Sequence, residues 1–277
     1  MGLRLIHLSD IHFGYEDVPA LEAATEFVRA TPFDLLMITG DITQFGDEAE
    51  FEAAARWLDA LPGPKLSTPG NHDTPWAGLA ERLVMPWERY DRLIAPLTAP
   101  HFSAPGLMVR SINSARGWQI RLNWSKGEVS RGQAQRAGTA LETAAPAARR
   151  IVACHHPLIE VPGGPMTGRV RGGRFAAERL VSAGADLIVT GHLHAPFVQA
   201  LPFGDRLTFA VGAGTLSRRE RGEPASFNVI NIDGDNLTVA VMAWNGRTLH
   251  VGRAWEVTLR SRPAVAASGG THGRQGC

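Results

Sequence analysis

The sequence predicts an α/β fold with a second β-sheet packed on the first, and three observations lead to this prediction. Up to about Gly191, apolar runs of strand length alternate with segments whose apolar residues recur at helical spacing. From Phe197 onward, strands separated by turn residues replace that alternation. Five apolar runs end abruptly on Asp, Asn or His, and ligands in α/β folds bind at the carboxyl ends of strands. We therefore expect these polar ends to line one cleft.

The five strands of this group are expected in chain order, and polar residues follow each of them closely. They are Leu3–Leu8 before Asp10-Ile11-His12, Leu35–Gly40 before Asp41, Leu66–Gly70 before Asn71-His72, Ile151–Cys154 before His155, and Leu187–Gly191 before His192-Leu193-His194. Imidazole, carboxylate and amide groups are metal ligands. The pattern therefore indicates a hydrolase with two metal ions.

Four helices are expected between the strands, from their amphipathic patterns and their end signals. The ranges are Val18–Ala30, Asp47–Leu61, Ser130–Thr143 and Arg174–Ala183. Pro19 suits the first turn of a helix. Asp47 with Glu50, and Ser130 with Gln133, have the spacing of a capping box.

The C-terminal third is expected to contain the strands of the second sheet. They are Phe197–Leu201, Leu207–Val211, Ser226–Ile232, Leu237–Trp244 and Leu249–Leu259, with turn residues between them. Met85–Trp124 shows one strand, Leu107–Ile112, and no other assignable pattern. Residues 261–277 are rich in Gly, Ser, Ala and Arg, which predicts a disordered tail.

The composition is that of an ordinary globular protein. With 277 residues, of which 44% are hydrophobic, the chain suffices for one large core, and we expect a single domain over residues 1–260. A formal net charge of +1 lacks the basic bias of a nucleic-acid or membrane surface, so neither partner is expected. Two cysteines imply no disulfide framework, and the first strand leaves no room for a signal peptide, so we expect a cytoplasmic protein.

Each polar strand end has a plain structural explanation when it is taken alone. A lone Asp-x-His or Gly-His-x-His is usually a polar turn, and Gly-Asn-His-Asp can be a turn that tolerates unusual backbone angles. The combination is different, because six of the ten histidines lie in these strand ends: His12, His72, His155, His156, His192 and His194. Motif order and strand context together predict a dinuclear metal site.

The motifs Asp-x-His, Gly-Asp, Gly-Asn-His-Asp, His-His-Pro and Gly-His-x-His, in this order, resemble the calcineurin-like metallophosphoesterase superfamily. The resemblance covers about two thirds of the chain and implies a four-layer α/β/β/α sandwich of two mixed sheets flanked by helices. It also implies two sets of metal ligands. One set is Asp10, His12, Asp41 and His194, and the other is Asp41, Asn71, His155 and His192, so that Asp41 bridges the ions.

These ligand types suit Mn, Fe or Zn, and the absence of thiolates argues against a structural zinc cage. Two divalent ions together carry about four positive charges. Asp10 and Asp41 contribute only two negative charges, so the site favours an anion. The resemblance implies that a hydroxide between the metals attacks phosphorus. It further implies that His72 contacts the phosphate and assists the leaving oxygen, with Asp73 orienting the imidazole.

Other residues are expected around the ligands. Strand alternation turns His156 away from its neighbour, to a place behind the ligands or at the pocket rim. The choice of His155 over His156 as the ligand rests on the resemblance alone. Two basic stretches, residues 169–174 and 218–221, offer Arg171 and Arg174 in one and Arg218 in the other, and either could supply a guanidinium to a second phosphate or a nucleotide. A solvated loop of mixed charge is the alternative for both.

The substrate is expected to be a small phosphodiester, such as a cyclic nucleotide. The compact pattern with His-His-Pro is similar to class III cyclic-nucleotide phosphodiesterases and related bacterial phosphodiesterases. A phosphomonoesterase or nucleotidase is the main alternative, and a DNA nuclease and a non-catalytic metal-binding scaffold are two others. The sequence leaves the oligomeric state open.

Overall fold

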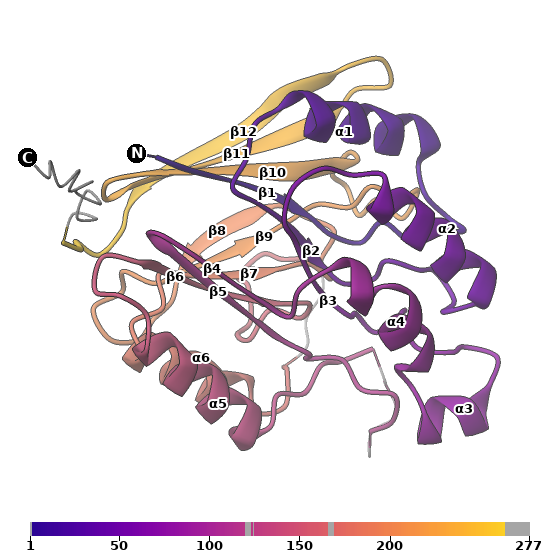
Figure 1. Cartoon of the computed structure of the whole chain (residues 1–277), viewed down its shortest axis with the longest axis horizontal. Coiled ribbons are helices and arrows are strands. Elements are labelled where there is room, and N and C mark those ends of the chain that lie inside the picture. Colours follow the sequence, from indigo (N-terminus) through magenta and orange to yellow (C-terminus); the bar gives the residue numbers. More distant parts are fainter. Residues whose placement is uncertain (1, 120–122, 124, 166–168, 264–277) are drawn as a thin grey trace, which may run out of the picture.

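Two six-stranded sheets lie face to face between two pairs of helices in the computed structural model, which describes residues 2–119, 123, 125–165 and 169–263 (Figure 1). One sheet has the spatial order β12 (Leu249–Thr258), β11 (Asn236–Trp244), β10 (Ser226–Asp233), β1 (Leu3–Leu8), β2 (Leu35–Thr39) and β3 (Lys65–Thr68). The other has the order β4 (His101–Ala104), β5 (Leu107–Ile112), β6 (Arg149–Cys154), β7 (Leu187–Thr190), β9 (Phe209–Gly212) and β8 (Phe197–Ala200). The predicted four-layer sandwich is confirmed.

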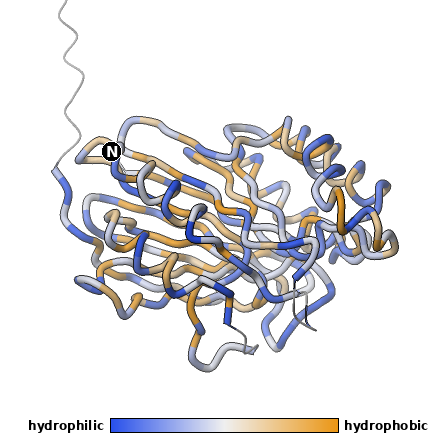
Figure 2. Tube along the Cα trace, turned by 90° about the horizontal axis from the view of Figure 1, so that it is seen from below, coloured by the Kyte–Doolittle hydropathy of each residue, from blue (hydrophilic) through white to orange (hydrophobic). Residues whose placement is uncertain are grey.

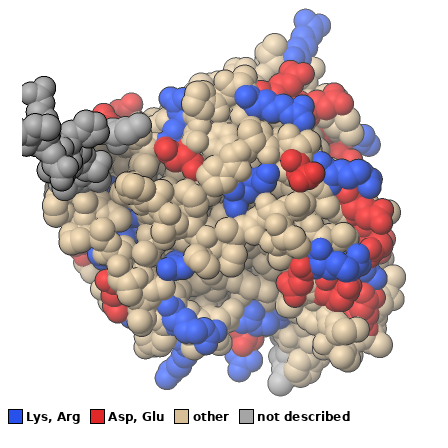
Figure 3. All heavy atoms as spheres, in the orientation of Figure 1, with Lys and Arg blue, Asp and Glu red and all other residues tan. Residues whose placement is uncertain are grey.

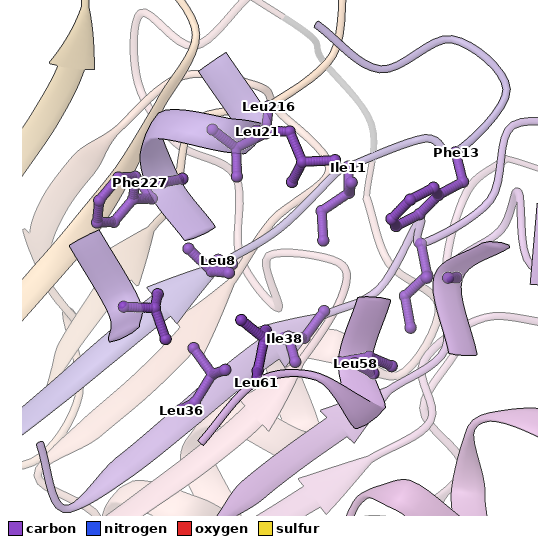
Figure 4. Close-up of a cluster of buried hydrophobic side chains, with 14 of the residues drawn as sticks. Leu8, Ile11, Phe13, Leu21, Leu36, Ile38, Leu58, Leu61, Leu216 and Phe227 are labelled. Atoms are coloured by element: carbon purple, nitrogen blue, oxygen red, sulfur yellow. The ribbon is translucent and has the colours of Figure 1, made fainter. Parts of the chain in front are cut away.

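Three groups of buried apolar side chains fill the three spaces between the layers. On β1, Ile6 and Leu8 face the helices α1 (Val18–Ala30) and α2 (Glu48–Asp59), whereas Leu5 faces the second sheet. This alternation follows from the two-residue period of a strand. Figure 4 shows the outer group, in which side chains from both helices meet those of β1 and β2. Figure 2 shows the same segregation along the whole trace, with apolar strands inside and polar connections outside.

The C-terminal strands do not form a sheet of their own, so that prediction is wrong. β8 and β9 extend the second sheet, with β9 parallel to β7, whereas β10 to β12 extend the first sheet, with β10 antiparallel to β1. The physical reason is that β1 and β7 each have a free edge whose backbone donors and acceptors need partners. The sequence pattern of a strand does not indicate which sheet edge the strand will join.

The helix ends follow the sequence signals closely. Asp47 with Glu50 at α2, and Ser130 with Gln133 at α5 (Arg131–Glu142), form the predicted capping boxes. The helix α6 spans Gly173–Ser182, so it begins and ends one residue earlier than predicted. Two short helices were not predicted, α3 (Leu79–Val84) and α4 (Glu88–Leu93), because six residues are too few to show a helical period. Within the described residues, no helix has the length and apolarity needed to cross a membrane.

Two residues that the prediction assigned to the disordered tail contact the domain. Ser261 Oγ donates to Asp235, and the Arg262 guanidinium pairs with the buried Asp186 carboxylate at 3.0 Å, so both residues are anchored to the domain. Residues 264–277 of the predicted tail lie outside the described residues. On the face shown in Figure 3, charges of both signs are mixed.

Candidate metal centre

The carboxyl ends of the five predicted strands meet at one place between the two sheets. β1, β2 and β3 run parallel in one sheet, and β6 and β7 run parallel in the other. The following loops are joined by main-chain hydrogen bonds, from Asp10 N to Gly40 O at 3.0 Å and from Gly191 N to His155 O at 2.9 Å. The convergence that the sequence predicts is therefore present.

The first group of side chains contains four buried residues: Asp10, His12, Asp41 and His194. One possible ligand atom from each lies within 4.8 Å of all the others. His194 Nε2 is 3.2 Å from Asp10 Oδ1, and His12 Nε2 is 3.9 Å from Asp41 Oδ2. These four residues are the set that the resemblance assigns to one metal.

The second group lies on the other side of Asp41. His155 Nε2 is 3.2 Å from Asp41 Oδ2, the same oxygen that faces His12, so Asp41 lies between the two groups. The rings of His155 and His192 have centroids 5.1 Å apart. Asn71, which follows β3, is also buried. The carboxylate of Asp41 is thus placed to serve both groups.

Several buried polar atoms of this cluster have no partner with hydrogen-bond geometry among the described residues. Asp10 Oδ1, Asn71 Oδ1 and His155 Nε2 are in this state. A buried polar atom without a partner is costly, and a bound cation would satisfy all three because each offers a lone pair. The donor set of nitrogen and oxygen ligands also suits a transition-metal ion. The residues present therefore fit a pair of metal ions.

Two of the histidines are held in the tautomer that a metal ligand requires. His155 Nδ1 donates to Thr39 O at 2.7 Å, and His194 Nδ1 donates to Arg219 O at 2.6 Å. Because each carbonyl can only accept, Nδ1 carries the hydrogen, and in the neutral ring Nε2 has its lone pair toward the cluster. Such contacts behind a ligand fix its orientation.

The electrostatics of the cluster also favour a cation. Burial alone would lower the pKa of His155, but the adjacent Asp41 carboxylate raises it to about 9. Burial alone would raise the pKa of Asp41, yet His155 and His72 hold it well below its usual range. Two buried carboxylates thus attract positive charge onto a neighbouring ring. A metal ion would replace that proton, so metal affinity should fall as the pH falls.

The backbone at these loops is unusual. Five of the predicted ligands have positive φ values, between 49° and 68°: Asp10, His12, Asp41, His192 and His194. Residues other than glycine rarely adopt this left-handed conformation, and such strain is concentrated at functional sites. The fold therefore holds these side chains in place against a local backbone preference.

His72 lies beside the cluster, but Asp73 does not orient it, so that expected contact is wrong. His72 Nδ1 donates to Gln44 O at 2.6 Å. The buried Asp73 carboxylate instead accepts from Thr43 N and Gly70 N, both at 2.8 Å. Burial, together with the nearby Asp41 charge, raises the pKa of Asp73 to about 6. Asp73 holds the loops together, and Gln44 fixes the His72 ring.

His156 is buried next to the second group, and both of its ring nitrogens are hydrogen-bonded. Nδ1 lies 2.9 Å from Ser114 Oγ, and Nε2 donates to Ser125 O at 2.8 Å. Since His155 Nε2 faces the Asp41 carboxylate at 3.2 Å, whereas both nitrogens of His156 bond to groups outside the cluster, the geometry favours His155 as the ligand. His156 and His192 also line a pocket that opens beside the cluster.

The three predicted substrate arginines are not at the cluster. The side chains of Arg171 and Arg174 are 65% and 80% exposed and pair with Glu128 and with Glu178 of the same helix, respectively, and Arg218 is also exposed. The structure instead places two other arginines there. Arg219 Nη1 is 2.8 Å from His72 Nε2, and Arg221 Nη1 donates to His192 O at 3.3 Å. The sequence marks the basic stretch but does not show which of its side chains turn inward.

His7 lies behind the cluster in the space between the sheets, fully buried. Its Nε2 is 2.9 Å from Thr39 Oγ1, and its Nδ1 accepts from Asn228 Nδ2 at 3.4 Å. Burial lowers the pKa of His7 to about 3, so the ring is neutral in the folded protein.

His7 should make the protein sensitive to acid. Its pKa in the folded state is lower than in the unfolded chain, so its contribution to stability is complete above about pH 6.5 and is lost as the pH falls toward 3. At about 1.4 kcal/mol per pH unit, moving from pH 7 to pH 5 should cost the wild type roughly 2 kcal/mol more than a His7→Gln variant. Urea unfolding at both pH values measures this difference, and equal pH slopes would contradict it.

Comparisons with known proteins agree with this geometry. The profile of the family described as Calcineurin-like phosphoesterase matches residues 3–196, a range that contains every residue of the two groups. A protein from Synechococcus sp. named "Probable cyclic nucleotide phosphodiesterase" is 26% identical over 259 residues, which are 88% of this chain and 93% of that protein.

Two further similarities are more limited. Glycerophosphodiester phosphodiesterase GpdQ from Enterobacter lignolyticus is 36% identical over 83 residues, which cover 26% of this chain and 30% of that protein. The crystal structure of a dimetal phosphatase from Danio rerio superposes with a TM-score of 0.66 at 12% identity, covering 93% of this chain and 99% of that one. At this identity the similarity concerns the fold alone.

Proposed function

Because the chain belongs to the calcineurin-like phosphoesterase family, we propose that it hydrolyses a small phosphodiester at a pair of metal ions between its two sheets. The convergence of two ligand groups on the Asp41 carboxylate is the observation that supports this proposal most directly. A phosphoryl oxygen is an anion that such a cationic site would attract. A cyclic nucleotide is one example of such a diester, and the relative from Synechococcus sp. carries that name.

The proposed ligands divide into two sets that share one residue. Asp10, His12, Asp41 and His194 would hold one ion, and Asp41, Asn71, His155 and His192 would hold the other. Mn, Fe or Zn suits these nitrogen and oxygen donors. When bound, two such ions supply a nucleophile from water at neutral pH and Lewis-acid stabilisation of the phosphoryl oxygens.

The protein's own residues would position the substrate and assist the leaving group. Gln44 O fixes a hydrogen on Nδ1 of His72, so that Nε2 faces the pocket, where it can donate to the leaving oxygen once it has taken up a proton from water. Asp73 holds the loop that carries His72 through its contacts with Thr43 and Gly70. His72 would therefore be the residue in contact with the reacting group.

Two pockets beside the cluster favour a diester. One is lined by His156, His192 and Lys126, and the other, with a volume of about 320 Å³, is lined by Asn71 and His72. A diester has two substituents on phosphorus; the larger pocket has room for one of them, and the first pocket, with a volume of about 60 Å³, would take only a small group of the other. Trp76 also lines the second pocket and is 71% exposed, so its ring is accessible to an aromatic leaving group.

A phosphomonoesterase is the alternative that one observation favours. Arg219 adds positive charge beside His72, and a monoester dianion benefits more from an added cation than a diester monoanion does. The ratio of the two activities decides between these functions.

The proposal predicts that protein reconstituted with Mn, Fe or Zn turns over bis(p-nitrophenyl) phosphate more efficiently than p-nitrophenyl phosphate. A cyclic-nucleotide panel and elemental analysis on the same samples would identify the metal that supports turnover. His72→Ala should lower kcat by about 100-fold, a typical loss for an acid–base group, while leaving the metal content nearly unchanged. A strong preference for the monoester would instead establish the phosphomonoesterase, and full metal occupancy without any turnover would establish a scaffold.

A further inference from the structure

The side chain of Arg219 contacts the residue that is placed to act on the leaving group. Its Nη1 is 2.8 Å from His72 Nε2 and 3.4 Å from Gln44 Oε1. Since Gln44 O fixes the hydrogen of His72 on Nδ1, Nε2 accepts the hydrogen bond from the guanidinium. In this arrangement the lone pair of His72 Nε2 is taken up by Arg219.

The segment that carries Arg219 is anchored to the metal centre. Thr215 Oγ1 donates to Asp10 O at 2.6 Å, and Arg219 N donates to Ser217 Oγ at 3.2 Å. The carbonyl of Arg219 itself accepts from the His194 ring. The main chain of Arg219 thus holds a predicted metal ligand, while its side chain extends to His72. A group on so rigid a support is well placed to bind with little loss of entropy.

The guanidinium has partners that are weak for an arginine. Gln44 and His72 are neutral acceptors, and among the described residues no carboxylate forms an ion pair with Arg219. Arg89 and Arg92, by comparison, pair with glutamates at 2.9 Å and 2.8 Å. A charge-assisted contact with an anion is roughly twice as strong as a neutral hydrogen bond, so a phosphoryl oxygen would displace His72 from Arg219.

We propose that Arg219 binds the phosphoryl group of the substrate and thereby releases His72 Nε2, which can then take up a proton from water and donate it to the leaving oxygen. This inference rests on the proposed function for its substrate, a phosphate ester. One guanidinium then has two roles, because occupying His72 in the free enzyme and binding the anion in the complex are alternative states of the same side chain. Arginine suits this because its planar group can donate two parallel hydrogen bonds to phosphate.

The test measures the affinity of inorganic phosphate for the metal-reconstituted protein by calorimetry. Arg219→Ala should weaken phosphate binding by about 10- to 100-fold, the loss expected for a charge-assisted hydrogen bond. Arg219→Lys should recover part of this affinity, because a single ammonium keeps the charge and loses the paired donors. Arg218→Ala is the matched control, since that neighbouring side chain is exposed, and its phosphate affinity should equal that of the wild type.

Two further measurements separate binding from structural damage. Metal content should stay unchanged in Arg219→Ala, because the main-chain carbonyl and not the side chain contacts His194. If Arg219→Ala nonetheless loses metal, Arg219→Gln, which retains a donor toward His72, takes its place in the comparison. The kcat/KM for p-nitrophenyl phosphate should fall more than that for bis(p-nitrophenyl) phosphate, because the monoester carries the larger charge. A purely structural role would lower both equally.

Equal phosphate affinity in the wild type and in a metal-replete Arg219 variant would overturn the inference. Failure of the proposed function gives a different result. If the wild type hydrolyses none of the esters, the phosphoesterase proposal fails, while the phosphate titration still decides whether Arg219 binds the anion.

Discussion

Asp41→Asn should abolish metal-dependent turnover and remove at least one metal ion per chain. The buried carboxylate of Asp41 lies 3.2 Å from His155 Nε2 and 3.9 Å from His12 Nε2, so one substitution affects both ligand groups. Loss of a partner behind a metal ligand already costs about 10- to 100-fold, so loss of a shared ligand should exceed roughly 100-fold in kcat/KM. Elemental analysis and steady-state kinetics on the same preparation measure both effects.

Thermal unfolding gives a second, independent test of the same residue. A ligand that binds only the folded state stabilises it by about 2.7 kcal/mol at a hundred times its dissociation constant, so metal should raise the Tm of the wild type. This increase should disappear in Asp41→Asn. Asp59→Asn, at an exposed carboxylate on α2, is the matched control and should keep both the increase and the activity. Asp41→Asn with wild-type metal content would refute the shared ligand.

Local signals in the sequence were sufficient to predict the helices and strands that form the layers. β1 and α1 have the predicted bounds, and both predicted capping boxes formed, because these features depend on residues a few positions apart. The placement of β10 beside β1 was not predictable in this way. This strand pairing joins Leu3 to Ile232, and no local sequence pattern indicates a contact between residues so far apart in the chain.

In the candidate site, too, the sequence predicts some features and not others. The polar strand ends were recognisable because five short motifs recur at the same structural position, and the structure brings them together. The sequence did not show which of several neighbouring side chains points into the site. Arg218 and Arg219 are identical in type and adjacent, yet only Arg219 turns toward His72, because Tyr15 O and Ser217 Oγ fix the path of the main chain. The partner of the His72 ring is likewise a main-chain carbonyl, which no side-chain motif reveals.

Gly191→Ala should damage the metal centre without removing any ligand. A Cβ built on Gly191 would overlap Ser9 Oγ and Asp10 Oδ2, and Asp10 Oδ2 accepts a hydrogen bond from His192 N at 2.9 Å. Ser9 is fully buried and bonded to Thr39 O, so it has no free space to enter. Overpacking of this kind typically costs about 1–3 kcal/mol, and here it also separates two predicted ligands. We expect a lower free energy of unfolding in urea together with a loss of bound metal.

A second glycine separates this steric effect from a general effect of alanine. A Cβ on Gly132, near the start of α5, would meet only the flexible end of Arg136 at 3.2 Å and Ser130 Oγ at 4.0 Å. Gly132→Ala should therefore be neutral or raise stability by about 0.5–1 kcal/mol, because alanine favours a helix. If Gly191→Ala bound metal and unfolded like Gly132→Ala, the close approach of the His192 loop to Asp10 would not be needed for the site. The tight contact between the β1 and β7 loops would then not account for the Gly in Gly-His-x-His.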